Sequence, residues 1–112
     1  MVSAIENFVL SATEHGRFTL QGNPSMTNAA YRGILEASQA LRASADEGDA
    51  AFSLLLDHSD AAVRTWAAYY LLPIKEEAAK RTLAAIAAGT DLIAFGAEVT
   101  LLEWNAGRLK IL

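Results

Sequence analysis

The sequence LLLDHSDAAVRTWAAYYLL, residues 54–72, encodes two short helices that meet at a polar corner. The leucines at 54–56 end the first apolar helix, and His58-Ser59 interrupts it. Ser59 or Asp60 can cap the next helix, because either side-chain oxygen can accept a hydrogen bond from a free backbone N–H of the first turn. Beyond the corner, apolar residues recur at spacings of three and four and share one helical face: Val63, Trp66, Ala67, Tyr70 and Leu71. We therefore expect this helix to lie at the centre of the core, with Val63 and Trp66 buried.

Helical periodicity and chain breakers predict four more helices around this corner. Gly22-Asn23-Pro24 ends the first helix, and the second begins near Ser25 or Thr27 and ends in a polar turn at residues 44–49. Pro73 suits the first turn of a fifth helix, and Thr90 or Asp91 can cap a sixth that Gly107 ends. On their inner faces the first two helices carry Ile5, Phe8, Val9, Ala12, Tyr31, Ile34, Leu35, Ser38 and Leu41. The other expected ranges are residues 3–18, 50–57, 60–72, 74–87 and 92–105, followed by an apolar tail, 108–112, that lies over the last helix pair.

The composition predicts a single all-α domain over residues 1–112. Hydrophobic residues make up 53% of the chain, and alanine, which is frequent, favours helices over strands. There is no cysteine, and the N-terminal segment has neither a basic start nor a long apolar run, so we expect a cytoplasmic protein without disulfides or membrane segments. Nine basic against thirteen acidic residues give a net charge of −4, the wrong sign for binding nucleic acid.

The sequence carries no recognisable catalytic, metal or cofactor motif. His15 and His58 lie near carboxylates but lack the HExxH spacing that puts two ligands on one helical face, so corner or solvent roles are expected for both. Ser59 has no glycine-flanked elbow, and the glycines are scattered singly, so neither a hydrolase nor a phosphate-binding loop is indicated. We therefore expect a protein that is not an enzyme and holds no cofactor.

An internal repeat is indicated by a shift that places Asn28 on Asp60 and Tyr31-Arg32 on Val63-Arg64. An aspartate at a corner followed by Val-Arg is the pattern of HEAT repeats, in which the aspartate caps or pairs between helices and the valine enters the core. Asp60 and Arg64 are therefore the expected structural corner, with Arg64 paired to a neighbouring acid. The expected architecture is a HEAT-like stack of about three antiparallel helix pairs.

A set of core and corner residues runs nearly end to end through the chain in a recognisable order: Phe8-Val9, Asn28, Tyr31-Arg32, Leu54-Leu55-Leu56, Asp57-His58, Val63-Arg64, Ala67-Ala68, Ala97, Thr100-Leu101, Glu103-Trp104 and Gly107. In these residues the chain resembles a small HEAT-like bacterial family catalogued as domain of unknown function twenty-nineteen. The family has no assigned enzyme activity, and some members are encoded among toxin and immunity genes. The resemblance therefore implies a non-enzymatic protein-binding module, and specifically an immunity protein that neutralises a bacterial toxin through its concave helical face; a structural or regulatory adaptor is the alternative.

A binding face is expected where the second helix of each pair lines a concave surface. The expected contact residues recur every three or four positions on the side of each helix that points away from the predicted core. Ala43, Leu72 and Ala94 lie on the same sides of these helices. Tyr69 is the expected anchor, because tyrosine offers rigid apolar area and a hydroxyl, and the acidic residues favour a basic protein such as a toxin domain. A solvent-facing Arg32-Glu36 pair is the simpler interpretation of part of this stripe. The expected partner-binding residues are Arg32, Glu36, Gln39, Thr65, Tyr69, Glu98, Leu102 and Asn105.

Overall fold

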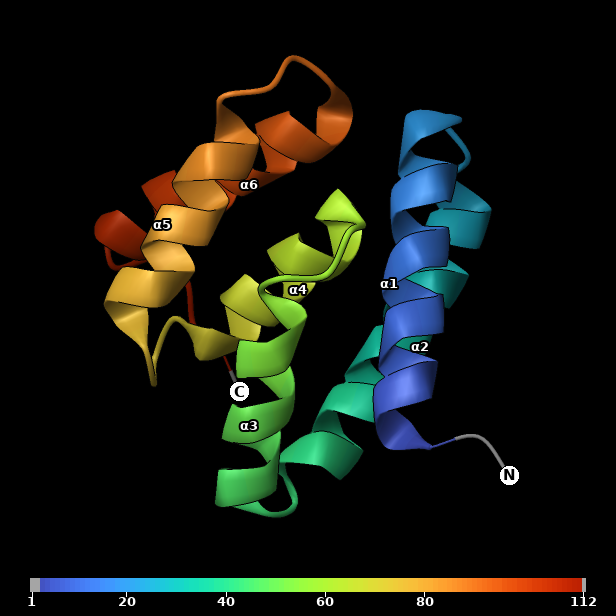
Figure 1. Ribbon diagram of the computed structural model, residues 1–112. Helices are drawn as coiled ribbons and strands as arrows, with labels where there is room; N and C mark the ends of the chain where they lie inside the picture. Colours follow the sequence, from blue (N-terminus) through green and yellow to red (C-terminus); the bar gives the residue numbers. More distant parts are fainter. Residues whose placement is uncertain (1–2, 112) are drawn as a thin grey trace.

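The computed structural model describes residues 3–111, which form six α-helices and no strand (Figure 1). All-α architecture is thus confirmed for the described part of the chain. The helices are α1 (Ala4–Leu20), α2 (Pro24–Arg42), α3 (Ala45–Leu55), α4 (Ala61–Leu71), α5 (Glu76–Ala87) and α6 (Leu92–Asn105).

Local capping chemistry fixes several helix ends. At the central corner Asp60 Oδ1 accepts hydrogen bonds from the backbone N–H groups of Ala62 at 2.8 Å and Val63 at 3.2 Å. Asp91 Oδ1 caps α6 in the same way through the N–H of Ala94 at 2.9 Å. Of the two candidates that the sequence offered at each of these helix starts, the aspartate is the cap, and it satisfies N–H groups that have no partner inside their own helix.

We expect Asp60→Ala to lower the free energy of unfolding by about 1 to 2 kcal/mol, because it removes both cap hydrogen bonds at α4. Thermal or urea unfolding followed by circular dichroism measures the loss. Asp60→Asn is the matched control: its amide oxygen can accept the same bonds, so it should retain most of the stability. Equal losses in the two variants would contradict a capping role.

The corner itself is held by contacts that differ from the expected acid pair. Arg64 Nη1 donates to the backbone carbonyls of His58 at 2.7 Å and Ser59 at 2.9 Å, so the prediction that Arg64 pairs with a neighbouring acid is wrong. The Asp60 N–H donates to His58 Nδ1 at 3.0 Å. His58 and Arg64 therefore satisfy backbone groups of the turn, which is a structural role.

Two helix boundaries and one repeat alignment differ from the sequence-based expectation. The expected turn at residues 44–49 lies mostly inside α3, where Asp46 and Glu47 occupy the first turn and favour the positive end of the helix. α5 begins at Glu76 rather than residue 74, because the N–H groups of Ile74 and Lys75 both donate to the Leu71 carbonyl and form a turn first. Asn28 lies within α2, and the capping residue there is Asn23, so Asn28 is not the counterpart of Asp60.

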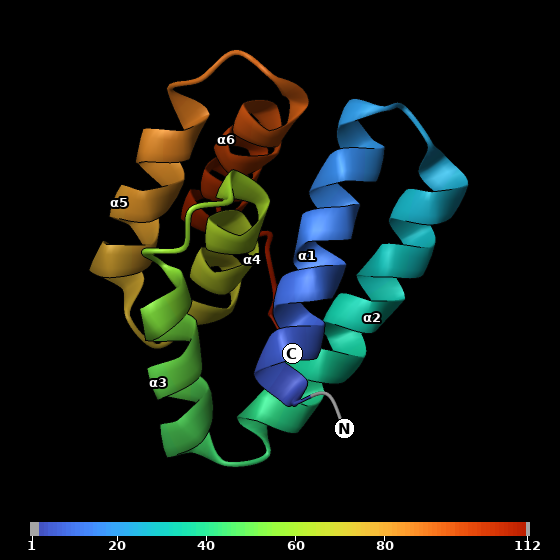
Figure 2. The same ribbon diagram turned by 45° about the vertical axis from the view of Figure 1, so that its right-hand side comes forward.

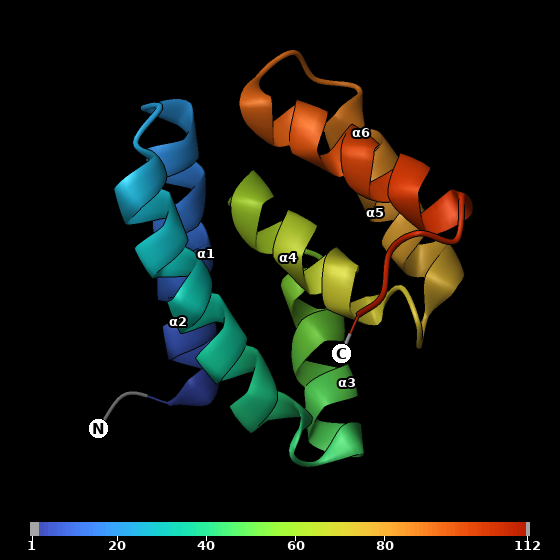
Figure 3. The same ribbon diagram turned by 180° about the vertical axis from the view of Figure 1, so that it is seen from behind.

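Helix α4 occupies the centre of the molecule, where it contacts α1, α3, α5 and α6. The most extensive contact joins α1 to α2, which lie side by side in Figure 2. Seen from behind, α2, α4 and α6 occupy the near face, with α4 between the other two (Figure 3). The buried core around α4 includes Phe8, Ile34, Phe52, Val63, Tyr70, Leu71 and Leu83.

Burial departs from the predicted pattern at several positions. Val63 is fully buried as predicted, whereas Trp66 is only half-buried. Tyr31, expected inside, is exposed, and its ring lies 5.7 Å from that of Trp66. Leu72 and Ala94, expected on the outward stripe, are buried in the packing around α4 and α6. In each case the neighbouring helix, and not the helix's own periodicity, decides which side is covered.

The C-terminal tail packs back onto the protein after α6. Gly107 adopts a left-handed φ of 74°, as expected for a helix stop, and the Arg108 N–H donates to the Glu103 carbonyl at 3.0 Å. Leu109 and Ile111 are partly buried against the core. The predicted covering role is consistent with these contacts, and the end of the predicted tail, Leu112, lies outside the described residues.

Candidate functional site

Several large apolar side chains are exposed together on one face of α6. Leu92, Phe95, Val99 and Leu102 follow one another at spacings of three and four, so they share one side of the helix. Phe95 is 62% exposed and Leu102 is 58% exposed. We call these four side chains the α6 apolar face.

A second apolar stripe on the same helix faces the core. Ala94 and Ala97 are buried, and Leu101 and Trp104 are partly buried against the core. Each residue of an α-helix advances by about 100°, which puts this stripe nearly opposite the α6 apolar face. A helix that is apolar on both sides normally has both sides covered.

Acidic side chains border the α6 apolar face. Glu98 is exposed between Phe95 and Leu102 in helical register. Glu103 is held by Arg108, whose Nε and Nη2 donate to its two carboxylate oxygens at 2.8 and 3.0 Å, and this pairing lowers the pKa of Glu103. The helix carries no lysine or arginine. Arg108 offsets the charge of Glu103, so Glu98 supplies the negative charge beside this face.

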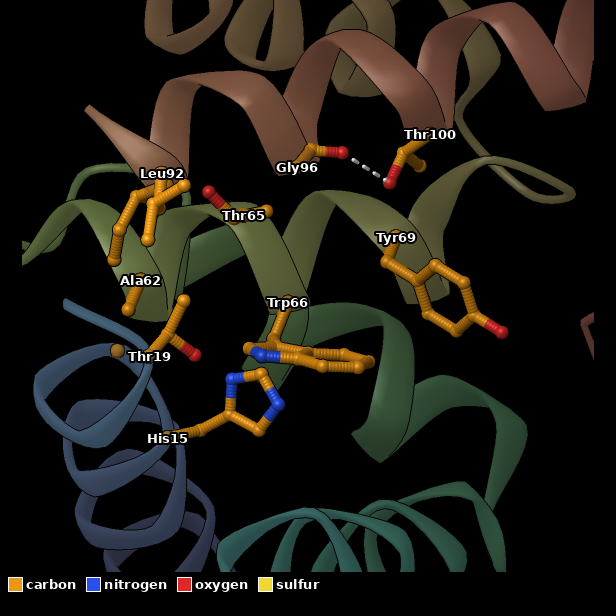
Figure 4. Close-up of a pocket in the computed structure, with 11 residues that line it drawn as sticks. His15, Thr19, Ala62, Thr65, Trp66, Tyr69, Leu92, Gly96 and Thr100 are labelled. Carbon is orange, nitrogen blue, oxygen red and sulfur yellow. Dashed lines mark hydrogen bonds between the residues drawn. The ribbon is translucent and has the colours of Figure 1, made fainter. Parts of the chain in front are cut away.

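Beside α6 lies a pocket of about 170 Å³ formed by α1, α4 and α6 (Figure 4). α1 and α4 approach closely at its edge because residue 16 is glycine, where an added Cβ would lie 2.5 Å from the Cβ of Ala62. Trp66 forms one wall, with the His15 ring 5.1 Å away in a T-shaped arrangement. Leu92 belongs both to this lining and to the α6 apolar face.

Two polar groups of α1 reach this pocket. Figure 4 shows the His15 ring and the Thr19 hydroxyl turned toward the space beneath Trp66. Burial lowers the pKa of His15, because desolvation disfavours the charged form of its ring. Thr19 Oγ1 is buried and has no hydrogen-bond partner within residues 3–111.

The eight residues predicted to bind a partner divide into three groups. Thr65 and Tyr69 line the pocket, and both are half-buried. The three from α2 and the three from α6 are exposed, with α4 between the two helices (Figure 3). Of the eight, only Thr65 and Tyr69 meet at the pocket. The exposed residues are Arg32, Glu36 and Gln39 on α2, and Glu98, Leu102 and Asn105 on α6.

The Tyr69 side chain is half-buried. Its ring lies 5.3 Å from that of Trp66 and 4.9 Å from that of Tyr70, and burial raises its pKa. Its position at the pocket wall gives it a packing role alongside any role in binding.

Sequence reasoning missed Phe95, Val99 and the pocket residues His15 and Thr19. The signal for the first two was present, because α6 carries two apolar stripes at helical spacing where one suffices for the core. No such signal marked His15 and Thr19, since their shared pocket depends on how α1 crosses α4.

Within residues 3–111, no three His, Cys, Asp or Glu side chains are grouped so that they could hold a metal ion. A membrane-spanning helix, which needs a long apolar stretch, was likewise not found in the part of the chain that the structure describes. Comparison with known proteins found no matching family model, no similar curated protein and no similar solved structure.

Proposed function

We propose that this chain is a protein-binding module that acts through the α6 apolar face rather than by catalysis. The observation that carries the proposal is the exposure of Leu92, Phe95, Val99 and Leu102 on one side of one helix. Contiguous exposed apolar patches with polar borders are typical of interaction sites, whereas single exposed leucines are ordinary. Covering one large apolar side chain contributes about 1.5 to 3 kcal/mol, so a partner that covers this face gains several such increments.

The partner is a basic protein. Glu98 borders the face, α6 has no cation, and the whole chain carries a net charge of −4. Charge complementarity of this sign raises the rate of association with a basic surface and makes that rate fall as salt is added. Of the predicted binding residues, Glu98, Leu102 and Asn105 lie on this helix.

A HEAT-like stack of about three helix pairs is part of the proposal. Its support is the placement of α2, α4 and α6 on one face of the molecule and the corner between α3 and α4 (Figure 3). In such stacks each unit covers the apolar side of the next, and an end unit without a neighbour exposes that side unless a partner covers it. The α6 apolar face fits the description of an uncovered end.

The biological role proposed for this binding is neutralisation of a cognate bacterial toxin in the cytoplasm. The support is the resemblance to the small HEAT-like bacterial family, some of whose members are encoded among toxin and immunity genes. A structural or regulatory adaptor is the second candidate, supported by the same exposed face. A gene for a toxin domain beside the coding sequence favours immunity, and a regulatory operon favours the adaptor.

Affinity purification from the native host tests the binding face. We expect the wild-type protein to retain a basic partner that the double variant Phe95→Ala/Leu102→Ala loses, because hot-spot truncations cost about 2 kcal/mol or more each. Leu54→Ala is the matched control, since Leu54 is 69% exposed but lies on α3, away from this face.

Three outcomes would contradict the proposal. The first is equal retention of the partner by the double variant and by wild type. The second is a wild-type protein that sediments as a dimer in analytical ultracentrifugation while the double variant sediments as a monomer. That result would assign the face to a second copy of this chain. For the immunity role, failure of the wild-type protein to restore growth when it is co-expressed with the toxin encoded beside it rejects neutralisation.

A further inference from the structure

The α6 apolar face has the spacing of a coiled-coil seam. Its residues Leu92, Phe95, Val99 and Leu102 are separated by three, four and three positions, which is the order a, d, a, d of a heptad repeat. At a rise of about 1.5 Å per residue these positions span about 15 Å, or nearly three helical turns. Val99 at an a position followed by Leu102 at a d position is a combination that favours pairing with one other helix.

The opposite side of α6 is occupied by the core of the protein. Ala94 and Ala97 are buried, and Leu101 and Trp104 are partly buried against the core. In the same heptad these four residues fall at c and f positions, whereas the a and d positions are exposed. The a and d positions of α6 are therefore available to a helix from outside the chain.

Carboxylates border one edge of this seam. Glu98 is exposed at a g position, and Asp91, which caps α6, lies one heptad earlier on the same edge and is exposed as well. The other edge carries Gly96 and Glu103 at e positions, and Arg108 Nε lies 2.8 Å from the Glu103 carboxylate. A helix packed along the seam meets negative charge on one edge and little net charge on the other.

A second copy of α6 does not fit this charge pattern. In an antiparallel pair g positions face g positions, so Asp91 and Glu98 would approach the same carboxylates of the other copy. In a parallel pair g faces e, which would place Glu98 beside Glu103 of the other copy. Like charges brought together in this way oppose association. The pattern instead favours lysine or arginine on the opposing edge.

We propose that the α6 apolar face binds one amphipathic α-helix of a partner protein, which packs alongside α6 through its own apolar heptad positions and places lysine or arginine beside Asp91 and Glu98. This inference rests on the proposed protein-binding function and names the element that is recognised. The two helix axes are inclined by about 20°, as in two-stranded coiled coils.

Titration with a synthetic helix tests the proposal. The probe is a fluorescein-labelled peptide of about three heptads with isoleucine at a, leucine at d and lysine at e and g, whose like charges oppose its own dimer. We expect fluorescence anisotropy to show saturable binding to the wild-type protein with a dissociation constant of about 10 μM. A peptide of the same composition with apolar residues at every second position should not bind, because these residues do not share one helical face.

Two charge variants establish the register of the bound helix. Glu98→Lys should weaken binding of the lysine peptide about threefold to tenfold, and strengthen binding of a matched peptide with glutamate at e and g. Glu36→Lys, which makes the same change at an exposed position of α2, should bind both peptides as the wild type does. Both substitutions are at exposed helical positions, so folding is preserved.

The inference is overturned if the lysine peptide at about 100 μM, ten times the expected dissociation constant, leaves the anisotropy unchanged. It is equally overturned if the alternating peptide binds as tightly, or if Glu98→Lys and Glu36→Lys have equal effects. Failure of the proposed function gives a different result, because Phe95→Ala/Leu102→Ala would then retain the native partner. If that variant loses the native partner while the wild type binds no lysine peptide, the binding face is supported and its helical occupant is rejected.

Discussion

Val63→Asp is expected to unfold the protein. Val63 is fully buried in the first turn of α4, the central helix, which packs against α1, α3, α5 and α6. A carboxylate placed there without a partner costs several kcal/mol, against a total stability of about 5 to 15 kcal/mol for a domain of ordinary size. Far-UV circular dichroism should show lost helicity, and the cooperative thermal transition should disappear.

Val99→Asp provides the matched control, because it makes the same chemical change on the α6 apolar face. Val99 is exposed, so its aspartate stays hydrated and the variant should fold and melt cooperatively. A folded Val63→Asp protein with an unchanged melting temperature would contradict the placement of α4 at the centre of the core. An unfolded Val99→Asp protein would show that the α6 apolar face is covered within the monomer.

Phe8→Ala is expected to lower the free energy of unfolding by about 3 to 5 kcal/mol, the range for truncating a core aromatic. Phe8 is fully buried, and its ring makes edge contacts with Phe52 at 5.3 Å and Tyr70 at 6.1 Å. Through these contacts α1 is joined to both α3 and α4. Urea unfolding of the variant measures the loss directly.

Phe95→Ala is the control for this second variant, since it removes the same side chain from a position that is 62% exposed. Its free energy of unfolding should change by less than about 1 kcal/mol. A large loss on Phe95→Ala with a small one on Phe8→Ala would reverse the assignment of core and surface.

The two pairs of variants, each made of a core substitution and its surface control, distinguish effects on folding from effects on binding. The variants at Val63 and Phe8 act on stability, because they disturb contacts that exist within the chain. The variants at Val99 and Phe95 should leave the fold intact and weaken only an interaction that covers α6. Binding measurements on folded Phe95→Ala therefore report on the proposed function without interference from unfolding.

The sequence by itself determined the helices and most of their ends. Asp60 and Asp91 mark the starts of α4 and α6, because capping involves only backbone groups two or three residues away. Gly22 and Gly107 mark helix ends because both adopt left-handed φ angles, which glycine tolerates best. Val63 was predictable as a core residue because it lies on the apolar stripe of α4. The caps and the glycine stops each depend on one element alone.

The boundary of α3 shows the limit of local reasoning. Gly48 was expected to mark a turn, yet it lies inside the helix and is buried. An added Cβ at residue 48 would lie 2.9 Å from the Leu41 carbonyl oxygen, so close packing against the end of α2 accounts for the glycine. The sequence does not distinguish a glycine that is needed for close packing against another helix from a glycine that is needed for a turn.

Only the tertiary structure decided which apolar faces are covered and where the pocket lies. α6 has two apolar stripes, and nothing in its own sequence distinguishes the one that meets the core at Ala97 from the one that exposes Phe95. Trp66 has the periodicity of a core residue but remains half-buried, because its outer side faces the pocket that α1 and α6 form over α4. Periodicity specifies a face relative to its own helix axis, whereas burial depends on what the other helices bring to that face.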